Sequence, residues 1–173
     1  MIRKVEEDAV HHGMIADDIG IEQQGTGAKA YAQAVGVYLD FLIEQMLDHS
    51  SSICGWNSPN AQMRSTFGRQ AIPMTWDYAE SNPFSSSTSS FNNMYIRMIE
   101  SFDGLSCMMR GFVNQCAAQS QKISLDKIIS TDPPYYDNIA YADLSDFFFF
   151  FFPHKLRDIY PSLFASIATP HAS

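Results

Sequence analysis

The chain has 173 residues, of which 46 % are hydrophobic and 17 % are charged, and its formal net charge is −8. This composition is typical of a globular domain with a core and excludes an intrinsically disordered chain. The eleven Lys and Arg residues are scattered along the sequence. Nucleic-acid phosphates are normally bound by a clustered basic face. If this chain acts on DNA, most phosphate contacts therefore have to come from another chain or segment.

The sequence gives no sign of a membrane or secreted protein. No stretch approaches the roughly 18–20 apolar residues of a membrane span, and the opening MIRKVEEDAV has basic residues without an apolar core behind them. The three cysteines have no CxxC spacing, and the five histidines have no familiar metal-ligand spacing. We therefore expect a cytoplasmic protein with reduced thiols, no metal and no membrane partner.

The first 27 residues are polar and contain four glycines, which predicts a loose lead-in segment with at most a short strand or helix. The pattern changes over residues 28–48. Apolar residues recur there at spacings of three and four, namely Tyr31, Val35, Tyr38, Leu42 and Met46. This spacing predicts an amphipathic helix with Thr26 as its N-cap.

Residues 53–89 are expected to form short pieces, because prolines at positions 59, 73 and 83 interrupt them. Residues 63–67 are predicted to form one or two helical turns, and the serine-rich run over residues 85–90 a loop. Residues 91–102 carry a second helical pattern, with Met94, Met98 and Phe102 on one face.

Two later stretches are candidate strands, residues 112–113 and the short apolar run LDKIIS over residues 125–130. We expect residues 128–131 to form a strand with Asp132 at its carboxyl end, the edge at which ligands of open α/β sheets collect. Residues 144–158 are expected to form the next helix. The predicted fold class is therefore α/β and helix-rich, with one domain over residues 28–173.

The tetrapeptide Asp132-Pro133-Pro134-Tyr135 has a composition suited to one chemical task. Two prolines fix two φ angles and remove two N–H donors, so the adjoining carbonyls are rigid acceptors. The Asp132 carboxylate adds an acceptor, and the ring of Tyr135 offers a flat face for a base. Together they could hold the amino group of an aromatic ring, as transfer to the exocyclic amine of a flipped base requires. By itself, the motif is equally compatible with a simple proline turn.

The same tetrapeptide resembles the catalytic motif of the DNA methyltransferases that modify exocyclic amines of adenine or cytosine. The longer string STDPPYYDNIAYADLSDFF is similar to a bacterial and archaeal group of large adenine-specific DNA methylases, which often carry an N-terminal domain of unknown function. The blocks GAKAYAQAVGVYLDF, FGRQAIPMTWDYAESNPF and LRDIYPSLFA also resemble that group and occur in the same order. The resemblance covers residues 25–170.

This resemblance implies a partial Rossmann-like methyltransferase domain with a helical insertion over residues 28–173. It also implies roles for individual residues. Asp132 and the carbonyl of Pro133 would accept hydrogen bonds from the target amine, Pro134 would keep the loop rigid, and Tyr135 would stack on the flipped base. Three further residues would shape the adjoining substrate-binding loop: Tyr136, Asp137 and Asn138. Catalysis would then rest on positioning and electrostatics.

The methyl donor implied by the resemblance is S-adenosyl-L-methionine, and its partner substrate is DNA. The Gly-rich donor motif of the family is absent from this sequence, so we expect an internal or C-terminal fragment that works with the remainder of a parent methyltransferase. The cofactor-binding residues stay unknown. The nearest glycine-rich stretch is GTGAKA over residues 25–30, which opens the first predicted helix and resembles an anion-binding turn only weakly.

An alternative is a catalytically inactive remnant that binds nucleic acid or a partner protein. The six consecutive phenylalanines over residues 147–152 support this alternative, because six aromatic residues cover every side of a helix. Some of the rings should be exposed and could mediate self-association. Pro153 follows directly, so we expect a kink or break near Phe152.

Overall fold

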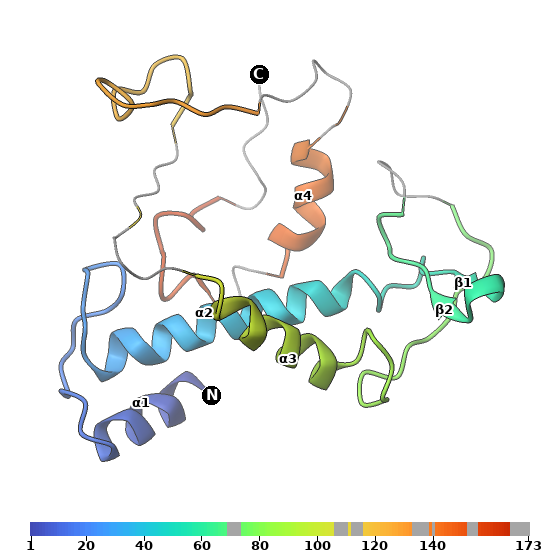
Figure 1. Ribbon diagram of the computed structural model, residues 1–173, viewed down its shortest axis with the longest axis horizontal. Coiled ribbons are helices and arrows are strands. Elements are labelled where there is room, and N and C mark those ends of the chain that lie inside the picture. The colour runs from blue at the N-terminus through green and yellow to red at the C-terminus, as the bar shows by residue number, and fades with distance from the viewer. Residues whose placement is uncertain are drawn as a thin grey trace.

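The computed structural model describes residues 1–68, 74–105, 111, 116–132, 139, 141–151 and 156–166. Within these residues the chain is mixed α and β and rich in helix. It contains four α-helices, one short 3-10 helix and a two-stranded antiparallel sheet (Figure 1). Parallel strands are not found in this part of the chain, so the Rossmann-like arrangement stays a prediction.

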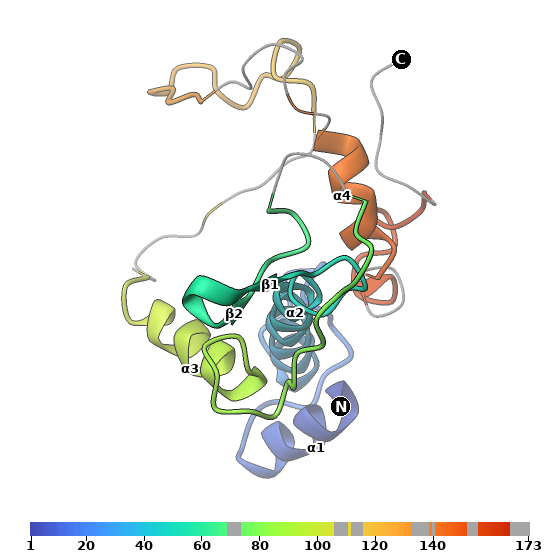
Figure 2. The same cartoon turned by 90° about the vertical axis from the view of Figure 1, so that its right-hand side faces the viewer.

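Helix α2 (Ala28–Leu47) confirms the helix predicted from the apolar spacing, although Gly27 rather than Thr26 occupies its N-cap. Other elements lie on several sides of it (Figures 1 and 2). Leu42 is buried on one side, whereas Asp40 and Glu44 are buried on the opposite side. Because α2 is central, it buries side chains on more than one face. The single apolar face predicted from the sequence is therefore incompletely buried, and two of its members, Tyr31 and Tyr38, are over 40 % exposed.

Helix α1 (Ile2–His11) lies within the predicted lead-in segment and packs against α2. The two helices come close together at Gly36, where an added Cβ would come within 2.8 Å of the Ile2 side chain. The absence of a side chain at Gly36 therefore lets the two helices approach this closely.

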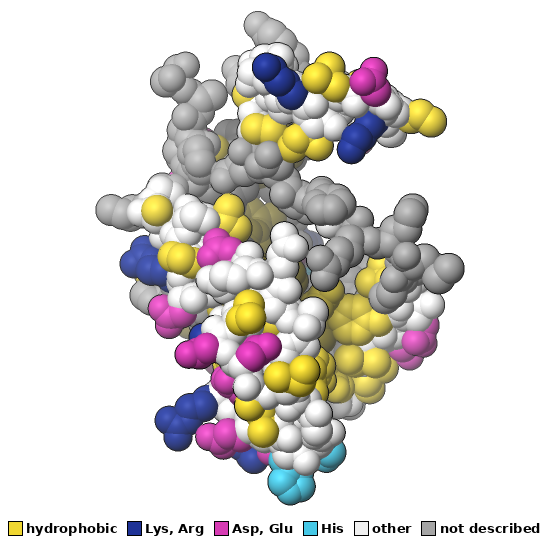
Figure 3. All heavy atoms as spheres, turned by 90° about the vertical axis from the view of Figure 1, so that its left-hand side faces the viewer, with side chains coloured by type: hydrophobic (Ala, Val, Ile, Leu, Met, Phe, Trp, Pro, Cys, Tyr) yellow, Lys and Arg dark blue, Asp and Glu magenta, His cyan; other side chains and the backbone are white. Residues whose placement is uncertain are grey.

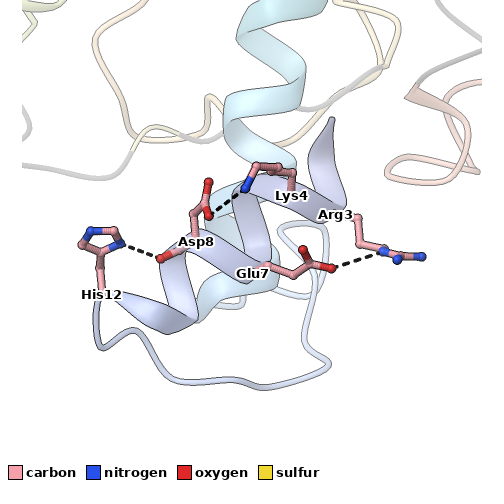
Figure 4. Close-up of polar contacts among 5 residues, drawn as sticks. All are labelled: Arg3, Lys4, Glu7, Asp8 and His12. Atoms are coloured by element: carbon pink, nitrogen blue, oxygen red, sulfur yellow. Dashed lines mark hydrogen bonds and ion pairs between the residues drawn. The ribbon is translucent and has the colours of Figure 1, made fainter.

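The outer surface of α1 carries two ion pairs, each of which joins residues one helical turn apart. Arg3 contacts Glu7 at 3.3 Å and Lys4 contacts Asp8 at 3.2 Å, and the Nδ1 of His12 lies 2.7 Å from the carbonyl oxygen of Asp8 (Figure 4). Both ion pairs are exposed and have the i, i+4 spacing, so each contributes only a few tenths of a kcal/mol, about 0.3–0.5.

Helix α3 (Phe91–Phe102) confirms the second predicted helix, and Ser90 caps it by accepting a hydrogen bond from the backbone N–H of Asn93 at 3.4 Å. The ring of Phe102 lies 4.8 Å from that of Tyr38 in an edge-on arrangement, which joins α3 to α2. Met94 is buried on the same helix.

The end of α2 is bound to a loop that follows it. The carbonyl oxygen of Asp48 accepts hydrogen bonds from the backbone N–H and the hydroxyl of Thr66, at 2.6 and 2.8 Å. Between them lies a hairpin of strands β1 (Trp56–Asn57) and β2 (Gln62–Met63), joined by the 3-10 turn Ser58–Asn60. The helical turn predicted for residues 63–67 is therefore wrong, because Met63 pairs with Trp56 across the hairpin and residues 64–67 contain no helix.

Helix α4 (Tyr141–Phe149) begins three residues before the predicted helix and ends well before residue 158, which corrects that prediction. Phe150 and Phe151 form a turn. Residues 152–155 lie outside the described part. Because proline has no backbone N–H, Pro153 could not donate the hydrogen bond that a longer helix would require. The rings of Phe147 and Phe148 lie 5.2 and 5.4 Å from that of Phe67, which places α4 beside the loop at the end of α2.

Residues 156–166 return to the beginning of the chain. Leu156 and Ile159 are buried, and the hydroxyl of Ser162 donates to the Glu22 carboxylate at 3.1 Å. Burial, with a smaller contribution from the nearby charge of Glu22, raises the pKa of Tyr160 above the ordinary tyrosine value.

Leu42→Ala should destabilise the protein by about 2–5 kcal/mol, because it removes a fully buried side chain from the central helix. The matched control is Phe41→Ala, which removes a half-exposed ring from the adjacent position of α2. Urea unfolding measures both changes. Equal losses for the two variants would contradict this assignment of the buried face.

Stability should fall at alkaline pH because of Tyr160. A raised pKa in the folded state means that the contribution of Tyr160 is fully present below the unfolded pKa of about 10. That contribution is lost as the pH rises through the higher folded value. Tyr160→Phe should flatten the alkaline limb in chemical unfolding measured from pH 8 to 11, whereas Tyr78→Phe, at an exposed position, should leave it unchanged.

Candidate functional site

The segment that leads to Asp132 consists of turns. Residues 116–132 extend away from the helices (Figures 1 and 2). The backbone N–H groups of Gln121 and Lys127 donate to the carbonyls of Ala117 and Ser124, at 3.1 and 3.3 Å. Asp126 adopts a positive φ of 59°, a conformation that Asp tolerates in turns. These hydrogen bonds join residues within the segment and do not connect it to the helices.

The strand predicted over residues 128–131 is not formed, which corrects the placement of Asp132 at the carboxyl end of a strand. Ile128 is fully exposed and Ile129 is about two-thirds exposed. A strand requires a neighbour with which its N–H and C=O groups can pair. The two described strands, β1 and β2, pair with each other, and neither pairs with this run.

Asp132 is exposed and lies in irregular backbone. None of the three ion pairs found among the described residues involves it. Its carboxylate can therefore accept hydrogen bonds from a ligand without first breaking one of those contacts. The other predicted site residues lie outside the described residues, and their roles stay predictions: Pro133, Pro134, Tyr135, Tyr136, Asp137 and Asn138.

The glycine-rich stretch over residues 25–30 is poorly suited to bind an anion. Gly27 is the N-cap of α2, and the Asp17 carboxylate lies so close that a Cβ on Gly27 would come within 2.5 Å of it. A carboxylate near a helix N-terminus already occupies the position that favours negative charge. Ala28 is also completely buried, so this helix end has little open space.

An open cavity of about 680 Å³ lies between the end of α2 and helix α4. Phe67, Phe148 and Phe149 form most of its apolar wall, and Glu44 and Asp48 lie on the α2 side. Helix α4 begins nine residues after Asp132 and is the first described helix after the predicted site. The cavity is therefore lined by the helix that follows this site in the sequence. Its size is within the usual range for small-molecule pockets, about 300–1,000 Å³.

Two buried carboxylates were not singled out by the sequence analysis. Asp40 is 1 % exposed and Glu44 is 5 % exposed, and both lie on the same side of α2. Ionised groups rarely occupy such positions, because burial disfavours their charge unless partners compensate for it. A signal was present in the sequence, since two acidic residues four apart interrupt an otherwise apolar helix.

Other groups in the described residues do not form a recognisable centre. No cluster of three or more His, Cys, Asp or Glu side chains there could hold a metal ion. Cys54 is buried, with its Sγ 3.4 Å from the carbonyl oxygen of Asp48, so it belongs to the loop contacts at the end of α2. Of the described helices, none has the length and apolar character needed to cross a bilayer.

Comparisons with family models, with curated proteins and with solved structures found no match to this chain.

Proposed function

We propose that this chain is part of a DNA methyltransferase that transfers a methyl group from S-adenosyl-L-methionine to the exocyclic amine of adenine. The observation that carries the proposal is the sequence Asp132-Pro133-Pro134-Tyr135 together with its flanking blocks. Transfer to an amine needs acceptors for the amine hydrogens and a flat surface for the base, and these four residues supply both.

The exposed carboxylate of Asp132 is consistent with this chemistry. As the amine nitrogen takes up the methyl group it becomes positively charged, and a nearby carboxylate stabilises that charge more strongly than it stabilises the neutral amine. The proton can leave the nitrogen afterwards, so the reaction needs no side chain with a raised pKa. Asp132 would act as acceptor and Tyr135 as the stacking ring.

The finer fold that we propose is a partial Rossmann-like domain that needs the remainder of its parent enzyme. The exposed run at residues 128–129 supports this proposal. Two adjacent isoleucines are costly to leave in water, and they would be covered if residues 128–131 joined a parallel sheet supplied by another segment. Asp132 would then lie at the carboxyl edge of that sheet.

The charge of the chain also favours a contribution from elsewhere. Acidic and basic side chains are interspersed on the face shown in Figure 3, with hydrophobic side chains exposed between them. With a net charge of −8, the chain offers DNA little electrostatic attraction. We therefore assign base capture to this chain, and propose that the remainder of the enzyme supplies the donor site and most phosphate contacts.

Asp132→Ala should reduce methyl transfer by about 10²- to 10³-fold, the usual effect of losing one acceptor that stabilises transition-state charge. The assay co-expresses the chain with a matching upstream segment that carries a donor motif, and measures N6-methyladenine in the DNA by mass spectrometry. Tyr135→Ala should weaken base capture by about 1–3 kcal/mol, and Tyr135→Phe should have a much smaller effect because the stacking face survives.

The matched control is Asp126→Asn, which changes another exposed carboxylate of the same segment and keeps a residue type that tolerates a positive φ. This variant should transfer methyl groups at the rate of the unchanged chain. Full activity of Asp132→Ala would mean that the tetrapeptide is only a turn, and the methyltransferase proposal would then fail.

A second candidate function is an inactive remnant that binds partner chains, and the exposed apolar residues of α2 and α3 favour it. At least 40 % of each of these side chains is exposed: Tyr31, Tyr38, Phe41, Tyr95, Ile96 and Ile99. Large apolar side chains that gather on a protein surface often mark a contact site for another chain. Under either candidate function, this surface should promote self-association.

Sedimentation velocity at micromolar concentrations should therefore show association that increases with concentration, despite the acidic net charge. Replacing both Ile96 and Ile99 with Ser should reduce the association, because it removes exposed apolar side chains of α3 from this surface. A single monomeric species for the unchanged chain across this range would contradict the expectation.

A further inference from the structure

A second cavity, of about 580 Å³, lies away from the segment that carries Asp132. Three parts of the chain line it: the end of α2, the β1–β2 hairpin, and the serine-rich segment that leads into α3. Figures 1 and 2 show these elements converging at one end of α2. The cavity is partly open to solvent, and its volume suits a small organic ligand.

Trp56 supplies a flat aromatic wall in this cavity. It pairs directly with Met63 across the hairpin, so the two side chains project from the same face of the sheet, and both line the cavity. Trp56 is 52 % exposed, although a tryptophan without a function is more often covered. An exposed indole in a pocket is well suited to stack on a planar ring.

Amide side chains surround this aromatic wall. Gln45, Asn60 and Gln62 line the cavity, and none of the three side chains forms a hydrogen bond within the described part of the chain. An amide presents both a donor and an acceptor, which is the pattern needed to read the edge of a nucleobase. His49 also lines the cavity, and its Nδ1 is buried with no partner among the described residues, so it is a further polar group still to be satisfied.

Arg97 adds a positive charge to the cavity. Its Nε donates to the carbonyl of Asn93 at 3.3 Å, and a second guanidinium N–H donates to the carbonyl of Thr88. These two bonds orient the guanidinium while leaving other N–H donors for an anionic oxygen. Glu80 is the acidic residue of the lining, and its carboxylate is suited to accept from sugar hydroxyls rather than to lie near a phosphate.

We propose that this cavity binds a purine nucleoside monophosphate, with the base stacked on Trp56 and the phosphate at Arg97. The ring platform, the free amides and the oriented guanidinium match the three parts of such a ligand. A purine presents a larger stacking face than a pyrimidine. The proposal is independent of the methyl-transfer proposal, because none of the residues that line this cavity belongs to the predicted transfer site.

The experiment uses the full chain carrying Trp76→Phe, which leaves Trp56 as the single tryptophan. Trp76 is 96 % exposed and does not line the cavity, so this change should not disturb the site. Titration with adenosine monophosphate should quench the Trp56 emission in a saturable manner. Uridine monophosphate should bind more weakly, and methyl glucoside should cause no saturable change.

Equilibrium dialysis with labelled adenosine monophosphate then separates the roles of the residues. Trp56→Ala should weaken binding about 5- to 150-fold, the range for loss of one stacked base, while Trp56→Phe should retain most of the affinity. Trp76→Ala is the matched control and should bind normally. Arg97→Gln should weaken binding of the monophosphate but leave adenosine binding unchanged.

Three results would overturn the proposal. These are normal binding by Trp56→Ala, a saturable response to methyl glucoside that equals the response to the nucleotide, and the absence of any saturable response to adenosine monophosphate. Circular dichroism of each variant establishes that it is folded. If Trp56→Ala fails to fold, Arg97→Gln takes its place in this comparison, with normal binding of the monophosphate as the contradicting result.

Discussion

The carbonyl oxygen of Asp48 is the point on which the middle of the structure depends. Carbonyl groups in the last turn of a helix have no partner within the helix and must find donors elsewhere. Here Thr66, eighteen residues later, supplies both its backbone N–H and its hydroxyl, and Cys54 contacts the same oxygen. Because Thr66 and Cys54 are completely buried, the loop is fixed to the end of α2, and Phe67 is placed against α4.

This arrangement explains why both cavities lie at the same end of α2. Gln45 lines each of them, with the phenylalanines of α4 on one side and the hairpin with Trp56 on the other. The hairpin interrupts the loop between Cys54 and Thr66, so the contacts that complete the helix end also fix the position of the indole. The end of α2 therefore positions both the cavity that contains Trp56 and helix α4.

The segment around Asp132 is organised differently. Its turns are held by their own hydrogen bonds, and its two adjacent isoleucines are exposed. The described elements provide no strand beside the tetrapeptide that begins at Asp132. Under the methyltransferase proposal, the site is completed when another segment supplies that strand and covers the isoleucines, which would couple burial of apolar surface to assembly of the site.

The sequence by itself determined two of the helices and the candidate chemistry. Residues 28–47 and 91–102 form helices because their apolar spacing acts within a few residues. The side chains of Asp132-Pro133-Pro134-Tyr135 indicate a candidate chemistry, which stays a prediction. Only the tertiary structure decided which sides of α2 are buried, that residues 128–131 form no strand, and that Trp56 and Arg97 line one cavity. Those outcomes depend on contacts between residues far apart in the chain, and neither the periodicity nor the composition of a short segment specifies its distant partners.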